Sequence, residues 1–226
     1  MPSTLHSEAV ASTLNRLLAA EERQDLEAAF ADAGIDVAGD FPIELSAADL
    51  AERTKDIIMS VSREGGQLLY LFTRAVKARS VVEFGTSFGI STLYLAAAVR
   101  DNGGGRVITT ELQSDKARRA RENFAAAGLG DLIDLRLGDA RETLRELPGT
   151  VDLLLLDGWP NLRLPILNLV QPRLRPGALV IVDDIDLDIG RDFNQGFLDH
   201  INDPANGYLS VRLPVHMGVQ MCLKLG

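Results

Sequence analysis

From Arg79 onward, short apolar runs alternate with amphipathic segments of about 12 residues, and no other feature of the sequence restricts the fold as strongly. The runs are rich in Val, Ile and Leu, as expected for strands that are buried on both faces of a sheet. The predicted strands are residues 80–84, 106–111, 132–137, 151–157 and 178–184. The predicted helices between them are residues 89–100, 114–127, a short segment after Asp139, and residues 162–173. This alternation predicts an α/β fold with a doubly wound parallel sheet.

The end of the chain predicts a hairpin instead of another strand-helix unit. Two strand-like runs, residues 208–214 and 218–225, follow each other with only a few residues between them. Parallel strands need a long crossover connection, so these two runs must be antiparallel. We therefore predict a doubly wound sheet with one antiparallel edge.

The beginning of the chain predicts helices alone. Residues 5–33 have apolar side chains at helical spacing and predict two short helices. Ser46 is a candidate N-cap for a third helix, and residues 64–77 predict a fourth. We accordingly predict an N-terminal helical cap at residues 1–56 and one larger domain at residues 57–226.

Charge and cysteine content exclude several classes of function. The 226 residues contain 23 Lys and Arg against 32 Asp and Glu, a formal net charge of −9 that would repel the phosphates of a nucleic acid. Cys222 is the one cysteine, which favours a reducing compartment. Neither a secretion signal nor an apolar run of about 18 residues is present in this sequence. We expect a cytoplasmic protein with a small-molecule partner and without a nucleic-acid or membrane partner.

The residues after the first three predicted strands suggest a nucleoside cofactor, because ligands of open parallel sheets bind beyond the carboxyl ends of the strands. The turn from Gly85 to Gly89 lets a ligand approach the backbone and directs free helix N–H groups at it. Glu111 closes the second strand, where an acid can accept both hydroxyls of a ribose. Asp139 follows the third strand, where an adenine could be bound. The alternatives are a turn that needs glycine for geometry alone, a solvated Glu111, and Asp139 as a helix N-cap.

Three acids at the ends of the fourth and fifth predicted strands suggest a cation site: Asp157, Asp183 and Asp184. Carboxylates that converge repel one another, and a hard divalent cation such as Mg²⁺, Mn²⁺ or Ca²⁺ is their natural partner. The alternative is that Asp183 or Asp184 caps the segment that follows. Trp159 is a candidate wall of a substrate pocket or ordinary packing. A basic run on a predicted helix is interpreted as a solvated face: Lys116, Arg118, Arg119 and Arg121.

Two other enzyme classes fit part of the same pattern. A nicotinamide-dependent oxidoreductase would use the glycine turn, but the turn reads G-x-x-x-G and not G-x-G-x-x-G. A serine hydrolase would use Ser87, because GTSFG fits G-x-S-x-G and acids and histidines follow in the required order: Asp157, Asp183, His200 and His216. Against the hydrolase, its nucleophile turn needs earlier strands, and the preceding residues predict helices. We interpret the histidines as ordinary structural residues.

Two segments resemble the class I S-adenosylmethionine (SAM)-dependent methyltransferases, and within them the cation-dependent O-methyltransferases of the catechol and caffeoyl-CoA type. The segment VSREGGQLLYLFTRAVKARSVVEFGTSFGISTLYLA resembles the family's stretch from the helix over the cofactor through its first motif, and LPVHMGVQMCLKL resembles its closing hairpin. The resemblance covers about residues 57–225. It implies a Rossmann-like seven-stranded sheet in the order 3-2-1-4-5-7-6. It also implies methyl transfer from SAM to a small, vicinal dihydroxy aromatic acceptor with a divalent cation, Mg²⁺ by expectation.

The resemblance implies a role for each matching residue. Ser62 and Glu83 would lie against the methionine part of SAM, Ser91 would hold its carboxylate, and Glu111 would hold the ribose. The remaining cofactor residues it implies are Gly85, Thr86, Ser87, Leu112, Asp139, Ala140 and Asp157. The metal ligands it implies are Asp157, Asp183 and Asp184, with Asp157 also the catalytic residue.

Three positions depart from the family pattern. Asp184 stands where the third metal ligand is usually Asn, Pro160 stands where the family has the lysine that acts as general base, and Met217 replaces an acid common in relatives. These departures leave a second interpretation open, namely a SAM-binding protein of the same fold whose activity is lost or independent of metal. The helical cap also offers a surface for a homodimer.

Overall fold

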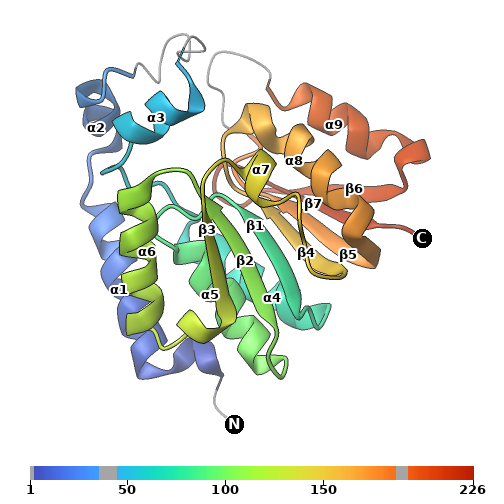
Figure 1. Cartoon of the computed structure of the whole chain (residues 1–226), viewed down its shortest axis with the longest axis horizontal. Helices are drawn as coiled ribbons and strands as arrows, with labels where there is room; N and C mark the ends of the chain where they lie inside the picture. Colours follow the sequence, from blue (N-terminus) through green and yellow to red (C-terminus); the bar gives the residue numbers. More distant parts are fainter. Residues whose placement is uncertain (1–2, 36–44, 187–192) are drawn as a thin grey trace.

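A single seven-stranded sheet organises the computed structural model, which describes residues 3–35, 45–186 and 193–226. The strand order within these residues is β3-β2-β1-β4-β5-β7-β6 (Figure 1). The strands are β1 (Ser80–Phe84), β2 (Arg106–Glu111), β3 (Ile133–Leu137), β4 (Val151–Leu156), β5 (Leu174–Val182), β6 (Tyr208–Leu213) and β7 (Val219–Lys224). The predicted α/β fold and its strand order are confirmed.

The chain order reverses between β1 and β4, at the centre of the sheet. β1 pairs in parallel with β2 on one side and with β4 on the other. Phe84, the last residue of β1, lies opposite Thr110 in β2 and Leu156 in β4. The three strands therefore end at the same level, and the residues that follow them meet at one edge of the sheet, where open α/β sheets bind ligands.

The far edge of the sheet is the predicted antiparallel hairpin. β7 runs antiparallel to both β5 and β6. β5 differs from its predicted bounds at both ends. It begins at Leu174 because this residue pairs with Val151 before a shift in the β4–β5 register. It ends before Asp183 and Asp184, and Asp184 has a φ of 51°, a left-handed conformation that a regular strand does not contain.

Helices cover both faces of the sheet (Figure 1). One face packs against α1, α4, α5 and α6, in a core that includes Val81 and Leu155. The other face packs against α7, α8 and α9, in a core that includes Val82 and Leu154. The helices are α1 (Glu8–Glu22), α2 (Leu26–Asp32), α3 (Ala47–Arg53), α4 (Arg63–Ala75), α5 (Ile90–Asp101), α6 (Ser114–Ala126), α7 (Ala140–Thr143), α8 (Arg163–Val170) and α9 (Gln195–Asn202). Over the described ranges, none of these helices has the length and apolar character needed to cross a membrane.

The N-terminal region is helical wherever the structure describes it. The apolar face of α1 joins the main core through Val10, Leu14, Leu17 and Leu18, whereas α2 and α3 belong to a small separate core. Ser46 is the N-cap of α3, as predicted, because its Oγ accepts a hydrogen bond from the Asp49 N–H at 3.1 Å. The helix that it starts is short and lies near the N-terminus of α6. The proposed division of the chain at residue 56 stays a prediction.

Candidate active site

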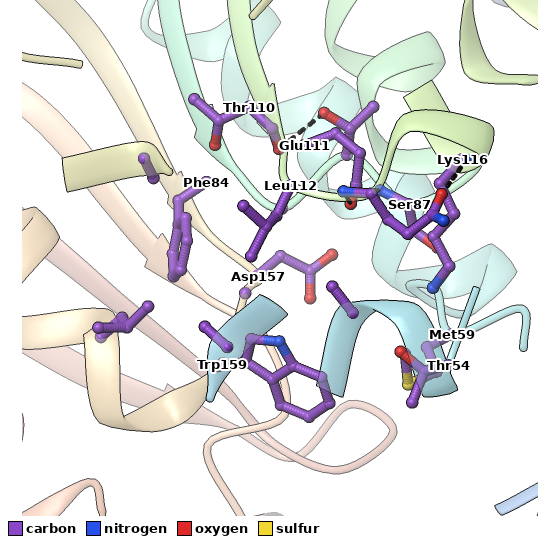
Figure 2. Close-up of a pocket in the computed structure, with 18 of the residues that line it drawn as sticks. Thr54, Met59, Phe84, Ser87, Thr110, Glu111, Leu112, Lys116, Asp157 and Trp159 are labelled. Atoms are coloured by element: carbon purple, nitrogen blue, oxygen red, sulfur yellow. Dashed lines mark hydrogen bonds between the residues drawn. The ribbon is translucent and has the colours of Figure 1, made fainter. Parts of the chain in front are cut away.

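A pocket opens where the central strands end. It encloses about 1200 Å³ of empty space, part of it open to solvent. The predicted cofactor and metal residues that line it are Gly85, Thr86, Ser87, Ser91, Glu111, Leu112, Asp139, Ala140, Asp157 and Asp184, whereas Asp183 does not line it. Figure 2 shows Glu111, Asp157 and Trp159 around this space. The pocket brings together residues that are more than 90 positions apart in sequence, as expected at a topological switch point.

The glycine turn after β1 is held by hydrogen bonds to β2. Gly85 has a φ of 100°, and Thr86 donates its N–H to the Thr110 carbonyl at 3.0 Å. Ser87 has a φ of 49°, and its buried Oγ has no hydrogen-bond partner among the described residues. Gly89, with a φ of 89°, then starts α5. The backbone therefore turns sharply from strand to helix beside the pocket.

Glu111 is oriented toward the pocket by two backbone donors. Its Oε2 accepts a hydrogen bond from the Ser87 N–H at 2.8 Å, and its Oε1 accepts one from the Gln113 N–H at 2.9 Å. Burial raises the pKa of Glu111, while these N–H groups and Lys116 act in the opposite direction. Each carboxylate oxygen keeps a further lone pair. Glu111 can therefore accept two more hydrogen bonds from a ligand.

Glu83 and Ser62 lie outside the residues that line the pocket. Glu83 is completely buried, and its carboxylate accepts hydrogen bonds from the hydroxyls of Ser91, Thr92 and Thr109. Burial raises the pKa of Glu83 to about 7, against the effect of those hydroxyls. The Ser62 Oγ caps α4 by accepting a hydrogen bond from the Gly65 N–H at 3.1 Å. In this structure both residues support neighbouring elements, and their contact with a cofactor stays a prediction.

The three predicted metal ligands come together. Oxygen atoms of Asp157, Asp183 and Asp184 lie within 4.8 Å of one another. Burial, followed by repulsion from its neighbours, raises the pKa of Asp157, and the pKa of Asp183 is raised for the same two reasons. A divalent cation would relieve this repulsion, and an all-oxygen set of ligands suits Mg²⁺ or Ca²⁺.

Arg163 places one positive charge beside these acids. Its guanidinium is buried, with Nη1 donating to Asn194 Oδ1 at 2.5 Å and Nη2 donating to the Asp183 carbonyl at 2.7 Å. Three ionised carboxylates and one guanidinium leave a net charge that a divalent ion would balance. This buried charge was not predicted, because a single Arg at the start of a predicted helix gives no signal of burial.

The interpretation of the basic run is wrong for one residue. Arg118, Arg119 and Arg121 are exposed or partly exposed, but Lys116 is only 4% exposed and lines the pocket. Lys116 shares the buried face of α6 with Ala120, four residues along the helix. Because most residues of this segment are charged, the sequence did not show that Lys116 lies on the same helix face as Ala120.

Asp139 is the N-cap of α7, which is the alternative interpretation given for this residue above. Its side chain caps α7 by accepting a hydrogen bond from the Arg141 N–H at 2.8 Å, and it pairs with the Arg141 guanidinium. This pairing lowers the pKa of Asp139. Asp139 still lines the pocket, so the cap does not remove it from the candidate cofactor residues.

The serine hydrolase interpretation has no support in the structure. The Ser87 Oγ has no hydrogen-bond partner in the described part of the chain, so it is not paired with a histidine. His200 instead interacts with Gln171, and His216 interacts with Asp184. Within the described ranges the sheet also has no strand before β1. The arrangement lacks the base that a serine nucleophile needs.

We therefore expect Ser87→Ala to keep the fold and to weaken only ligand binding. The Glu111 contact of Ser87 is made by its backbone N–H and survives the change. The measurement is thermal unfolding together with labelling by an organophosphate. Covalent labelling of Ser87, with an esterase activity that disappears in the variant, would contradict this account.

Comparisons with known proteins agree with the geometry. Residues 82–185 match the family model described as a methyltransferase domain. A catechol O-methyltransferase of Mycobacterium tuberculosis is 34% identical over 142 residues, and the match covers 62% of this chain and 62% of that protein. A catechol O-methyltransferase of Niastella koreensis is 31% identical, with 58% of its length matched. The chain thus spans less than two thirds of these curated relatives.

Solved structures extend the similarity over more of the chain. The O-methyltransferase TomG from Streptomyces achromogenes, solved in complex with SAM, superposes with a TM-score of 0.68 at 25% identity, covering 90% of this chain and 100% of that one. An O-methyltransferase from Bacillus cereus, solved with S-adenosylhomocysteine (SAH), has a TM-score of 0.70 at 24% identity, covering 94% and 90% of the two chains. The second likeness shows the fold alone.

Proposed function

We propose that the chain belongs to the class I SAM-dependent methyltransferases, in the O-methyltransferase group of the catechol and caffeoyl-CoA type, and that it moves a methyl group from SAM to a hydroxyl of a small acceptor. One observation carries the proposal. Glu111, from one side of the strand-order switch, and Asp157 and Asp184, from the other side, line the same pocket, and Asp183 lies against these two acids. A nucleoside site and a cation site therefore adjoin each other.

The cofactor would occupy the side of the pocket formed by β1, β2 and β3. Glu111 would accept the ribose hydroxyls, since each of its oxygens keeps a lone pair after its backbone contact. The backbone after Gly85 would pass beneath the methionine part, with Ser87 supplying a buried hydroxyl that has no partner within the described residues. Asp139 and Ala140 line the part of the pocket suited to adenine.

SAM supplies an electrophilic methyl group, so the protein needs no nucleophile of its own. The chain must align the acceptor oxygen with that methyl group. Such alignment generally lowers the activation barrier by several kcal/mol. Leu112, Met59 and Trp159 give the pocket apolar walls that fit an aromatic acceptor and limit water. The acceptor itself is a proposal drawn from this lining and from the family.

Asp157, Asp183 and Asp184 would hold a divalent cation. The fit rests on their convergence within 4.8 Å and on the burial and repulsion that raise the pKa values of Asp157 and Asp183. When bound, such an ion acts as a Lewis acid and template for acceptor hydroxyls. Within the chain, Arg163 holds the backbone of Asp183 in place, and Pro160 has no side chain that could take a proton.

The same Pro160 favours a second candidate function. A chain that keeps the cofactor pocket but lacks the family's basic residue could bind SAM without transferring its methyl group. Stoichiometric SAH binding, with no methylated product from vicinal dihydroxy aromatics with or without Mg²⁺, would favour this binding protein over the enzyme.

We expect Glu111→Ala to weaken SAH binding by about tenfold to a hundredfold, because hydrogen bonds to a charged group are worth about 1.5 to 3 kcal/mol each. Calorimetric titration of SAH measures the change, with thermal unfolding as the check on folding. Glu122→Gln is the control, because Glu122 lies on the same stretch of chain but is exposed and pairs with Arg118. Equal affinities of Glu111→Ala and wild type would remove the ribose assignment.

A further inference from the structure

Lys116 is a buried cation that the proposed chemistry does not use. Lysine is almost never fully buried unless it is paired, yet this side chain is only 4% exposed. Its Nζ lies 5.5 Å from the centroid of the Phe88 ring, and no hydrogen bond from Nζ to any described residue is present. The side chain lines the pocket beside Ser87 and Glu111 (Figure 2).

The charged groups that act on Lys116 come from three parts of the chain. Glu111 lies at the end of β2, Arg119 lies one turn further along α6, and Asp56 lies in the segment after α3. α3 contributes Ala47 and Ala51 to the pocket, and its C-cap Thr54 lines it too; none of the three is charged. Burial lowers the pKa of Lys116 to about 8, although Glu111 acts to raise it. The ammonium thus faces the pocket with hydrogen-bond donors to spare.

We propose that Lys116 is a specificity-determining residue for the cofactor, and that its ammonium donates a hydrogen bond to a ribose oxygen beside Glu111. The inference rests on the proposed SAM site. A ribose hydroxyl is both a donor and an acceptor, and a carboxylate can satisfy only its donor function. A carboxylate and an ammonium at one place satisfy both functions, and they recognise an intact ribose better than either group alone.

A hydrogen bond donated by this ammonium makes ligand binding depend on pH. A ligand that accepts a hydrogen bond from the ammonium binds the protonated lysine best, so binding raises the pKa of Lys116. The affinity must then fall as the pH rises above the pKa of Lys116 in the free protein, about 8.

The test uses 5′-methylthioadenosine, which has the nucleoside part of SAM without the amino acid and has no group that titrates between about pH 7 and 9.5. Calorimetry on the full chain should show wild-type affinity falling about tenfold over this range, by up to tenfold for each pH unit above the lysine pKa. Lys116→Met should bind about tenfold more weakly than wild type at pH 7 and should be nearly independent of pH. Lys116→Arg, which stays charged, should bind without the loss at high pH.

Arg119→Met is the matched control. Arg119 also lies over the Phe88 ring, at 4.3 Å, but it is partly exposed and does not line the pocket. Its removal should leave the affinity at pH 7 as in wild type and should keep the fall in affinity at high pH, moved to a somewhat higher pH because Arg119 acts to lower the pKa of Lys116. A wild-type affinity that does not change between about pH 7 and 9.5 would overturn the inference, and this result does not depend on any variant folding. Lys116→Met that binds as wild type does at both ends of this range would overturn it too. Absence of nucleoside and SAH binding to wild type would instead overturn the proposed function.

Discussion

Asp157→Asn is expected to lower methyl transfer by on the order of 100-fold or more and to remove its dependence on Mg²⁺. Asp157 follows β4 directly, and its carboxylate is one of three that converge within 4.8 Å. The neutral amide keeps the shape of the side chain but weakens the hold on a cation. It also removes the carboxylate that Asp183 and Asp184 repel. Initial rates with added Mg²⁺, after treatment with EDTA, measure the effect.

The control for Asp157→Asn is Asp186→Asn. Asp186 lies two residues beyond the acid cluster and forms an ion pair with Arg212. This variant should keep its metal-dependent rate. SAH affinity should change much less than the rate in both variants. Undiminished methyl transfer by EDTA-treated wild type would contradict the metal assignment and indicate a metal-independent chemistry.

Gly85→Ala is expected to lower the free energy of unfolding by about 3 kcal/mol or more and to abolish SAH binding. Gly85 has a φ of 100°, which residues with a Cβ atom rarely adopt. A Cβ at this position would lie 2.6 Å from the Asp157 carbonyl oxygen, so β1 and β4 could not keep their spacing at the pocket. The substitution would therefore displace both the cofactor turn and Asp157. Chemical denaturation and calorimetry measure the two losses.

Gly103→Ala separates backbone strain from the close contact. Gly103 has a φ of 92°, close to that of Gly85, but a Cβ there would meet nothing within 4 Å. Gly103→Ala should lower the free energy of unfolding by about 1 to 2 kcal/mol, the cost of the left-handed conformation alone, and should leave SAH binding unchanged. If the two alanine variants lose the same stability, the contact between Gly85 and Asp157 has no role.

The arrangement of strands was predictable because the central strands have a strong and simple signal. Runs such as residues 151–157 are apolar throughout, as a strand buried on both faces must be. The bounds of β5 were less predictable, since they depend on pairing with Val151 and on the left-handed conformation of Asp184. α9 was not predicted, although Phe197 and Ile201 form its buried face, because two such residues in eight give little periodicity.

The candidate site was predictable where a residue type is tied to a strand end. Glu111 and Asp157 are such residues, and both line the pocket. Lys116 and Arg163 were not identified as buried charges, because burial depends on which face a helix turns toward the pocket. The roles assigned through the family, the metal ion, the acceptor, the cytoplasmic location and the homodimer stay predictions.

Titration of SAH into the purified wild-type protein tests the central claim most directly. The account predicts saturable binding of one SAH per chain, in competition with SAM, because a ligand in this pocket contacts Glu111 and the turn after β1. The same experiment with NADH should give no binding. No saturation at millimolar SAH, or tight NADH binding in its place, would contradict the assignment of this pocket to SAM.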